Sequence, residues 1–223
     1  MEKRGGKKYM WNDLEQNWKK CFELAWKSFK NNTVPIGAII VDESNNIVSE
    51  GRNMIFDKSS NNPLAGTTMA HAEMIAMSSL KRDKHPNINK YTLYTTMEPC
   101  PMCFGSITLV GIRSLKYASR DTYGGATILA ETMEYIKNKN IIIERGPKES
   151  ELFQIVIQAA YEHLRSLDTR EHVLESWCEN SPVGVKLAGE LANANYFQSA
   201  FNTNKPLCEV YDEILEMASP KTV

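Results

Sequence analysis

The sequence predicts an α/β protein followed by a helical C-terminal extension. Three observations lead to this prediction. Strand-like and helix-like segments alternate through residues 1–148 of the 223 residues, helical apolar spacing alone continues from Glu149, and the segment between the last two strands could hold a helix. Parallel neighbours need a crossover of about a dozen residues or more. We therefore expect a sheet whose last two strands run parallel.

The first predicted elements are a helix and a β-hairpin. Apolar residues recur at helical spacing over 11–30, which predicts a helix that ends before Asn31. An apolar, β-rich pattern covers 35–53 and is interrupted by a turn cluster at 42–46, as is typical of a hairpin. Residues 1–9 are basic and contain glycine, so we expect a loose tail there.

A long polar loop comes next, and helices and strands alternate after it. The loop is expected over 57–68 and a helix over 70–80. A strand at 91–95, a helix at 101–110 and a strand at 114–118 follow.

The remaining pattern is mostly helical. A helical stripe at 128–136 and a fifth strand at 141–143 complete the α/β part, and a longer helical stripe covers 152–164. We divide the chain into a first domain at 10–167 and a helical extension at 168–223. Further helices are expected at 173–177, 187–194 and 206–215.

The composition is that of an ordinary soluble globular protein. Hydrophobic residues make up 42% and charged residues 24%, and 26 basic against 27 acidic side chains give a net charge of −1. This charge does not support a broad nucleic-acid surface. No apolar run approaches the ~18 residues of a membrane span, and no apolar signal-peptide core follows the basic N-terminus. We expect a cytoplasmic protein with no membrane partner.

The residues that indicate chemistry are His71, Cys100 and Cys103. The two cysteines lie one helical turn apart, and His71 opens another predicted helix. One imidazole and two thiolates suit zinc, and three protein ligands leave a fourth position for water. Zinc lowers the pKa of a bound water from 15.7 toward about 7. We expect one zinc ion per chain.

Glu73 lies two residues after His71, so it need not be a ligand. A carboxylate beside the water could move its proton, which is typically worth ~10²–10⁴-fold in rate. The set predicts hydrolytic attack on an electrophilic carbon. A closed structural zinc site would instead need a fourth protein ligand, for example Cys21, Cys178 or Cys208.

The order HxE, strand, PCxxC is the signature of zinc-dependent deaminases. Residues 34–145 resemble the cytidine deaminase-like superfamily, especially the branch that holds tRNA adenosine deaminases, guanine deaminases and fungal-type cytosine deaminases. The stretches that carry the resemblance are VPIGAIIV (34–41), EGRN (50–53), MAHAEM (69–74), YTLYTTMEPCPMCFGSI (91–107) and ASRDTYGG (118–125).

The resemblance implies a three-layer α/β/α fold with a mixed five-stranded sheet, and usually a homodimer. It implies that His71, Cys100 and Cys103 resemble the zinc ligands and that Glu73 resembles the proton shuttle. Asn53 matches a position that hydrogen-bonds substrate in relatives.

Residues near these motifs are further candidates for the substrate pocket. With Asn53, the predicted substrate-binding set comprises Ala72, Met97, Glu98 and Tyr123. Glu98 could equally orient its loop by hydrogen bonding.

The predicted reaction replaces a ring amino group by a carbonyl and releases ammonia. We favour a free nucleobase, nucleoside or related amino-heterocycle as substrate. The alternative is adenosine in a tRNA anticodon loop: ASRDTYGG fits those enzymes, whereas the net charge and the Met69-Ala70 approach to His71 do not. A third possibility is a non-catalytic zinc-containing interaction module. For the extension, packing and oligomerisation are favoured over substrate contact.

Overall fold

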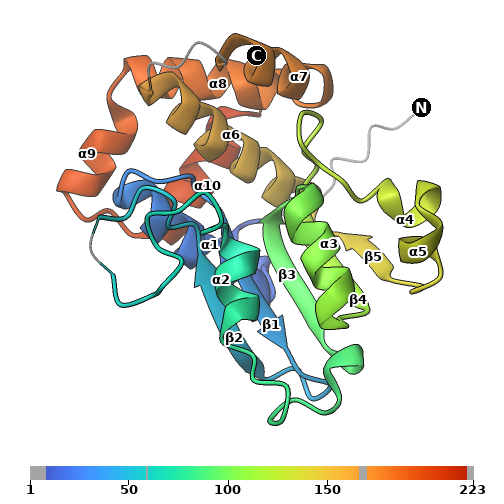
Figure 1. The fold of residues 1–223 in the computed structure, drawn as a ribbon. Helices are drawn as coiled ribbons and strands as arrows, with labels where there is room; N and C mark the ends of the chain where they lie inside the picture. Colours follow the sequence, from blue (N-terminus) through green and yellow to red (C-terminus); the bar gives the residue numbers. More distant parts are fainter. Residues whose placement is uncertain (1–8, 59, 166–169, 220–223) are drawn as a thin grey trace.

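The computed structural model describes residues 9–58, 60–165 and 170–219, which form a sheet between two layers of helices (Figure 1). β1 (Gly37–Val41) is antiparallel to both β2 (Ile47–Arg52) and β3 (Thr92–Met97), whereas β3, β4 (Ser114–Ser119) and β5 (Ile142–Arg145) are parallel to one another. The predicted three-layer fold and the parallel last two strands are therefore confirmed. The strand order is β2 (Ile47–Arg52), β1 (Gly37–Val41), β3 (Thr92–Met97), β4 (Ser114–Ser119), β5 (Ile142–Arg145).

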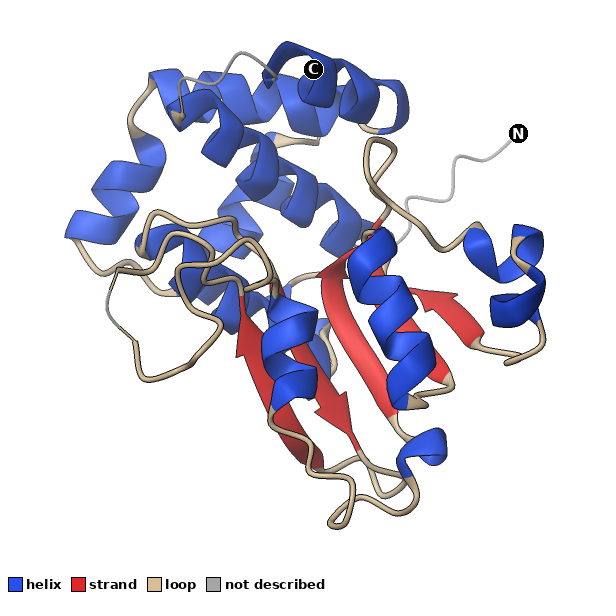
Figure 2. Cartoon of the chain, in the orientation of Figure 1, coloured by secondary structure: helices blue, strands red, loops and turns tan. Residues whose placement is uncertain are grey.

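The inner strand β1 is buried on both faces. Ile39 and Val41 belong to the apolar core on one side of the sheet, and Ala38 and Ile40 belong to the core on the other. Because side chains alternate along a strand, an apolar run of this kind needs helices on both faces. Figure 2 shows the two helical layers. One is built around α1 (Gln16–Lys30) and α6 (Lys148–Leu164), the other around α2 (Ala72–Ser78) and α3 (Pro101–Val110).

Two predicted helices are interrupted. The helix expected over 11–30 consists of a single 3₁₀ turn, Trp11–Asp13, followed by α1. The backbone N–H of Trp11 donates to Asp212 at 2.7 Å, a long-range contact that local spacing cannot anticipate. The stripe at 128–136 forms two short helices, α4 (Leu129–Thr132) and α5 (Glu134–Lys137).

The C-terminal helices share the core of the α1 and α6 layer. Trp177, Leu187, Phe197 and Tyr211 are buried in one cluster with Phe22 of α1. The predicted boundary between 167 and 168 lies outside the described residues, as does nearly all of the predicted tail, and the two-part division stays a prediction. The helices are α7 (Arg170–Asn180), α8 (Pro182–Asn193), α9 (Tyr196–Asn202), which the sequence did not predict, and α10 (Leu207–Met217).

Candidate active site

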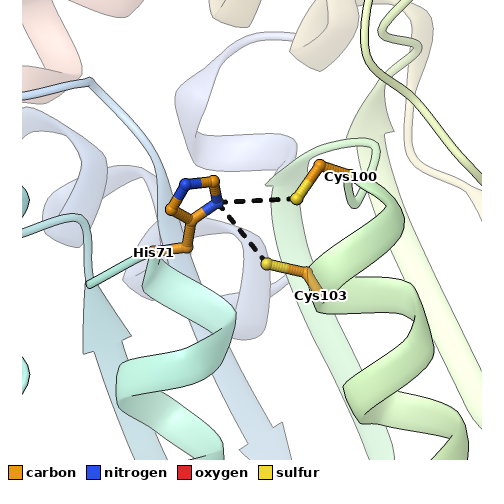
Figure 3. Close-up of side chains that lie close together, drawn as sticks. All are labelled: His71, Cys100 and Cys103. Carbon is orange, nitrogen blue, oxygen red and sulfur yellow. Dashed lines mark hydrogen bonds between the residues drawn. The ribbon is translucent and has the colours of Figure 1, made fainter. Parts of the chain in front are cut away.

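The three predicted metal ligands lie at the starts of two neighbouring helices (Figure 3). His71 is the residue that caps α2, and Cys100 is the residue that caps α3, with Cys103 one turn further along. Pro101 occupies the first position of α3, where its missing N–H is not needed for a helical hydrogen bond. Both helices begin at the end of the sheet where β3 ends, so their first turns face each other.

The donor atoms of these residues are grouped as a zinc ion requires. Nδ1 of His71 lies 3.6 Å from Sγ of Cys100 and 3.5 Å from Sγ of Cys103, and all three atoms lie within 4.8 Å of one another. A nitrogen and a sulfur bound at about 2.0–2.1 and 2.3 Å to a tetrahedral centre are about 3.5 Å apart. The set therefore fits zinc.

The group contains no fourth protein donor among the residues that the structure describes. Cys21 is buried in the α1 layer, with its Sγ 3.8 Å from the backbone oxygen of Tyr94. Cys178 is exposed on α7, and Cys208 lies on α10. Three protein ligands with an open position are typical of catalytic zinc, whereas structural zinc is closed by four.

The charges of the site favour a cation. A hydrogen bond from Cys103 and a further one with His71 lower the pKa of Cys100 to about 4. The bond to Cys100 and burial raise the pKa of Cys103, and the bond to Cys100 also raises the pKa of His71. One thiolate therefore forms readily, and the second forms once a bound cation compensates its charge.

Glu73 lies beside this group and is almost completely buried, with 3% of its surface exposed. Thr95 donates to its Oε1 at 3.2 Å, and Cys103 donates to its Oε2 at 3.5 Å. Burial raises the pKa of Glu73. A buried carboxyl with a raised pKa takes up a proton more readily than an exposed one and can return it, which is what general acid–base chemistry needs.

The position of α2 depends on Gly51 of β2. A Cβ atom at this position would lie 2.2 Å from the backbone oxygen of Ala72 and 2.5 Å from the nitrogen of Ala76. The strand and the helix therefore touch through their backbones. This close approach fixes the helix that carries His71 and Glu73.

Asn53 follows β2, and a backbone hydrogen bond joins the residue after it to the residue before His71. The N–H of Met54 donates to the oxygen of Ala70, the residue before His71, at 2.8 Å. The Asn53 side chain is buried, and its Oδ1 accepts from Thr33 Oγ1 at 2.8 Å and from the Ile55 N–H at 3.2 Å. These two bonds orient the amide so that its Nδ2 points away from them. Contact of Asn53 with substrate stays a prediction.

The other predicted substrate residues have different surroundings. Ala72 and Met97 are buried in the two cores that flank the sheet, and Tyr123 is 58% exposed. Glu98 accepts from the Asp121 N–H at 3.2 Å and from the Thr127 N–H at 3.1 Å, so it orients the loop after β4. Substrate contact by these four residues stays a prediction.

Sequence reasoning did not identify Thr95, Asp121 or Trp177. The adjacent Thr95 and Thr96, which are both buried at the end of β3 before the Cys100 loop, were a signal for polar groups near the site. The hydrogen bond of Trp177 to Asp121 spans 56 positions, and no local pattern indicates such a contact.

Comparison with known proteins gives the following matches. A family model described as the cytidine and deoxycytidylate deaminase zinc-binding region matches residues 12–119. The chain is 36% identical over 117 residues to a tRNA-specific adenosine deaminase from Haemophilus influenzae, covering 50% of this chain and 61% of that protein. It is 35% identical over 123 residues to a tRNA-specific adenosine deaminase from Rickettsia bellii, covering 54% of this chain and 79% of that protein.

Two further matches concern other proteins. A cytosine deaminase from Candida albicans is 26% identical over 126 residues, covering 56% of this chain and 71% of that protein. A solved structure of NE0047 in complex with 2,6-diaminopurine gives a TM-score of 0.50 at 19% identity, covering 68% of this chain and 82% of that one. At this identity the likeness shows the fold alone. The chain spans about three fifths of the length of the Haemophilus relative.

Proposed function

This chain belongs to the cytidine deaminase-like superfamily of zinc-binding proteins, and from that premise we propose that it is a zinc-dependent hydrolytic deaminase. The reaction replaces the exocyclic amino group of a cyclic amidine by a carbonyl and releases ammonia. The observation that supports this most is the contact of Glu73 with a ligand of the His71, Cys100 and Cys103 group.

The residues of the site have two roles in the proposed reaction, metal binding and proton transfer. His71, Cys100 and Cys103 would hold zinc, which would supply a water with a pKa lowered toward about 7. Glu73 would take a proton from this water and pass it to the ring nitrogen, and would then move the proton of the added hydroxyl group to the departing amine, which leaves as ammonia. Because Thr95 holds Oε1, Oε2 is the atom that exchanges the proton once Cys103 has become a thiolate and no longer donates to it.

The favoured substrate is a free nucleobase, nucleoside or related amino-heterocycle. The net charge of −1 supports this choice, since proteins contact nucleic-acid phosphates mainly through Lys and Arg clusters. The second candidate is adenosine in tRNA, which the names of the Haemophilus and Rickettsia relatives favour. A non-catalytic zinc module is disfavoured by the buried Glu73, which such a module would not need.

A substrate panel tests this proposal. Ammonia release is measured with amino-purines, amino-pyrimidines, their nucleosides and a tRNA transcript, for the wild type and for Glu73→Gln. Release with a small molecule supports the favoured substrate, and release with tRNA alone, with steeply salt-dependent binding, supports the second. Zinc binding without any release from the panel supports the non-catalytic module.

We also propose that the protein acts as a homodimer in the cytoplasm. On α3, Leu109 is 73% and Val110 is 37% exposed, which offers apolar surface to a second copy. Reducing conditions keep Cys100 and Cys103 available as metal ligands. None of the described helices has the length and apolar character to cross a membrane. Light scattering of the wild type and of Leu109→Asp tests the dimer, which the charged variant should weaken.

A further inference from the structure

The helix α7 of the C-terminal extension contacts the loop that follows β4. Trp177 is 4% exposed, and its Nε1 donates to Oδ1 of Asp121 at 2.9 Å. Next to it, Thr122 Oγ1 donates to the backbone oxygen of Ser176 at 2.6 Å, and Ser176 Oγ donates to Thr122 Oγ1 at 2.9 Å. Figure 1 shows this loop rising from the end of β4 toward α7.

Asp121 organises the loop from within. The Oδ1 that accepts from Trp177 also accepts the backbone N–H groups of Tyr123 and Gly124, each at 3.0 Å. The N–H of Asp121 itself donates to Oε2 of Glu98 at 3.2 Å. The side chain of Asp121 therefore joins α7 to the turn that carries Tyr123, and its backbone N–H joins this turn to Glu98.

The same loop is hydrogen-bonded to Glu98 and Pro99, the two residues before Cys100. Oε1 of Glu98 accepts from the N–H of Thr127 at 3.1 Å, and the oxygen of Pro99 accepts from the N–H of Ala126 at 2.9 Å. The next residue is Cys100. Two hydrogen bonds therefore join the loop to the residues that precede this ligand.

The loop borders open space on one side, whereas Ala126 is buried in the core beside the sheet. On its β5 side the loop borders a cavity of about 480 Å³, which is also lined by Tyr117, Ile143 and Arg145. Because an open cavity provides few packing contacts on that side, the hydrogen bonds to Glu98 and to α7 help to hold the loop there.

We propose that Trp177 and Ser176 are positioning residues of the active site. They hold the loop at 119–127, and through Glu98 this loop fixes Cys100 on one side and Tyr123 on the other. The family match ends at residue 119, so this support comes from a part of the chain beyond the matched region. The inference rests on the proposed zinc site.

The test compares two buried tryptophans in the full-length protein. Trp177→Phe keeps an aromatic ring and removes the N–H that binds Asp121. Trp26→Phe is the matched control, since Trp26 is 7% exposed in the same core and packs against Phe201 at 4.8 Å between ring centroids. Zinc affinity is measured by chelator competition, and the order of residues 119–127 is measured by hydrogen exchange.

We expect Trp177→Phe to raise the zinc dissociation constant and the exchange rate of 119–127 by about tenfold, with both changes within about twofold in Trp26→Phe. Equal effects in the two variants, or no effect of Trp177→Phe on loop exchange, would overturn the proposal. Thr122→Val, on the loop side of the contact, repeats the test if Trp177→Phe does not fold. Wild-type protein that binds no zinc would contradict the metal site. The hydrogen-exchange rates of residues 119–127 would still test whether α7 holds the loop.

Discussion

Sγ of Cys103 lies 3.5 Å from Oε2 of Glu73. A ligand of the proposed zinc site and the proposed proton carrier are thus in direct contact, although 30 positions separate them in the chain. Thr95 holds the other carboxylate oxygen, which leaves the side chain a single orientation. The metal group and the acid–base group therefore form one structural unit at the end of β3.

Replacing the carboxylate by an amide should separate metal binding from reaction. Glu73→Gln keeps the size of the side chain and a hydrogen-bond acceptor for Thr95, but it cannot take up and return a proton. Ammonia release should fall by about 10²–10⁴-fold, while elemental analysis should find zinc unchanged. Deamination at the wild-type rate would remove Glu73 from the mechanism.

Replacing a thiolate ligand should remove the metal. We expect Cys103→Ser to lower zinc affinity by more than about tenfold, because a serine hydroxyl does not replace a thiolate ligand. Cys178→Ser is the matched control, since Cys178 is exposed on α7. Zinc content after dialysis measures the effect, and equal loss of zinc in both variants would place the metal elsewhere.

The close approach of β2 to α2 should make Gly51 sensitive to a single methyl group. In Gly51→Ala the new Cβ would overlap the backbone of Ala72 and Ala76, so α2 must shift with His71 and Glu73. Overpacking of this kind costs about 1–3 kcal/mol. The melting temperature of the metal-free protein and the zinc affinity should both fall.

The control for this change is a glycine on the neighbouring helix. A Cβ at Gly105 of α3 meets no atom within 4 Å, and alanine is the better helix former by about 0.5–1 kcal/mol. Gly105→Ala should therefore keep or raise the melting temperature. If Gly51→Ala is as stable as Gly105→Ala, the backbone contact does not fix α2.

The extension should lose an ion pair as the pH falls. Lys205 and the Tyr196 hydroxyl donate to Glu213, and these bonds lower the pKa of Glu213. A carboxyl whose pKa is lowered by folding stabilises the folded state above its unfolded pKa of about 4.3, and this contribution is lost as the pH falls through the folded pKa.

Glu213→Gln should therefore lower the melting temperature at pH 7 by about 1–3 °C, a small effect because the pair is partly exposed. The difference from the wild type should vanish near pH 3. Glu209→Gln, at an exposed position of the same helix, serves as the control. A difference for Glu213→Gln that is equal at both pH values would contradict the role of the ion pair.

Local sequence patterns were sufficient for most of the fold because the strands and helices bury regular apolar faces. The zinc group could be proposed for a different reason. Cys100 and Cys103 stand one helical turn apart, His71 opens a second helix, and few other functions need these residue types at such positions. The resemblance to known deaminases then implied that these three residues correspond to zinc ligands and that Glu73 corresponds to the proton shuttle.

Contacts between distant parts of the chain could not be predicted in this way. The helix break before α1 accompanies a hydrogen bond of Trp11 to Asp212, and the support of the site by α7 depends on Trp177 and Asp121. For Glu98 the sequence left two roles open. Its bonds to Asp121 and Thr127 became visible only in three dimensions.

X-ray absorption spectroscopy at the zinc edge of the metal-loaded protein tests the metal site most directly. We expect two sulfur ligands at about 2.3 Å, from Cys100 and Cys103, and two lighter ligands at about 2.0–2.1 Å, from His71 and a solvent molecule, with the same spectrum for Glu73→Gln. A third sulfur ligand, or a spectrum unchanged in Cys103→Ser, would contradict an open zinc site built from these residues.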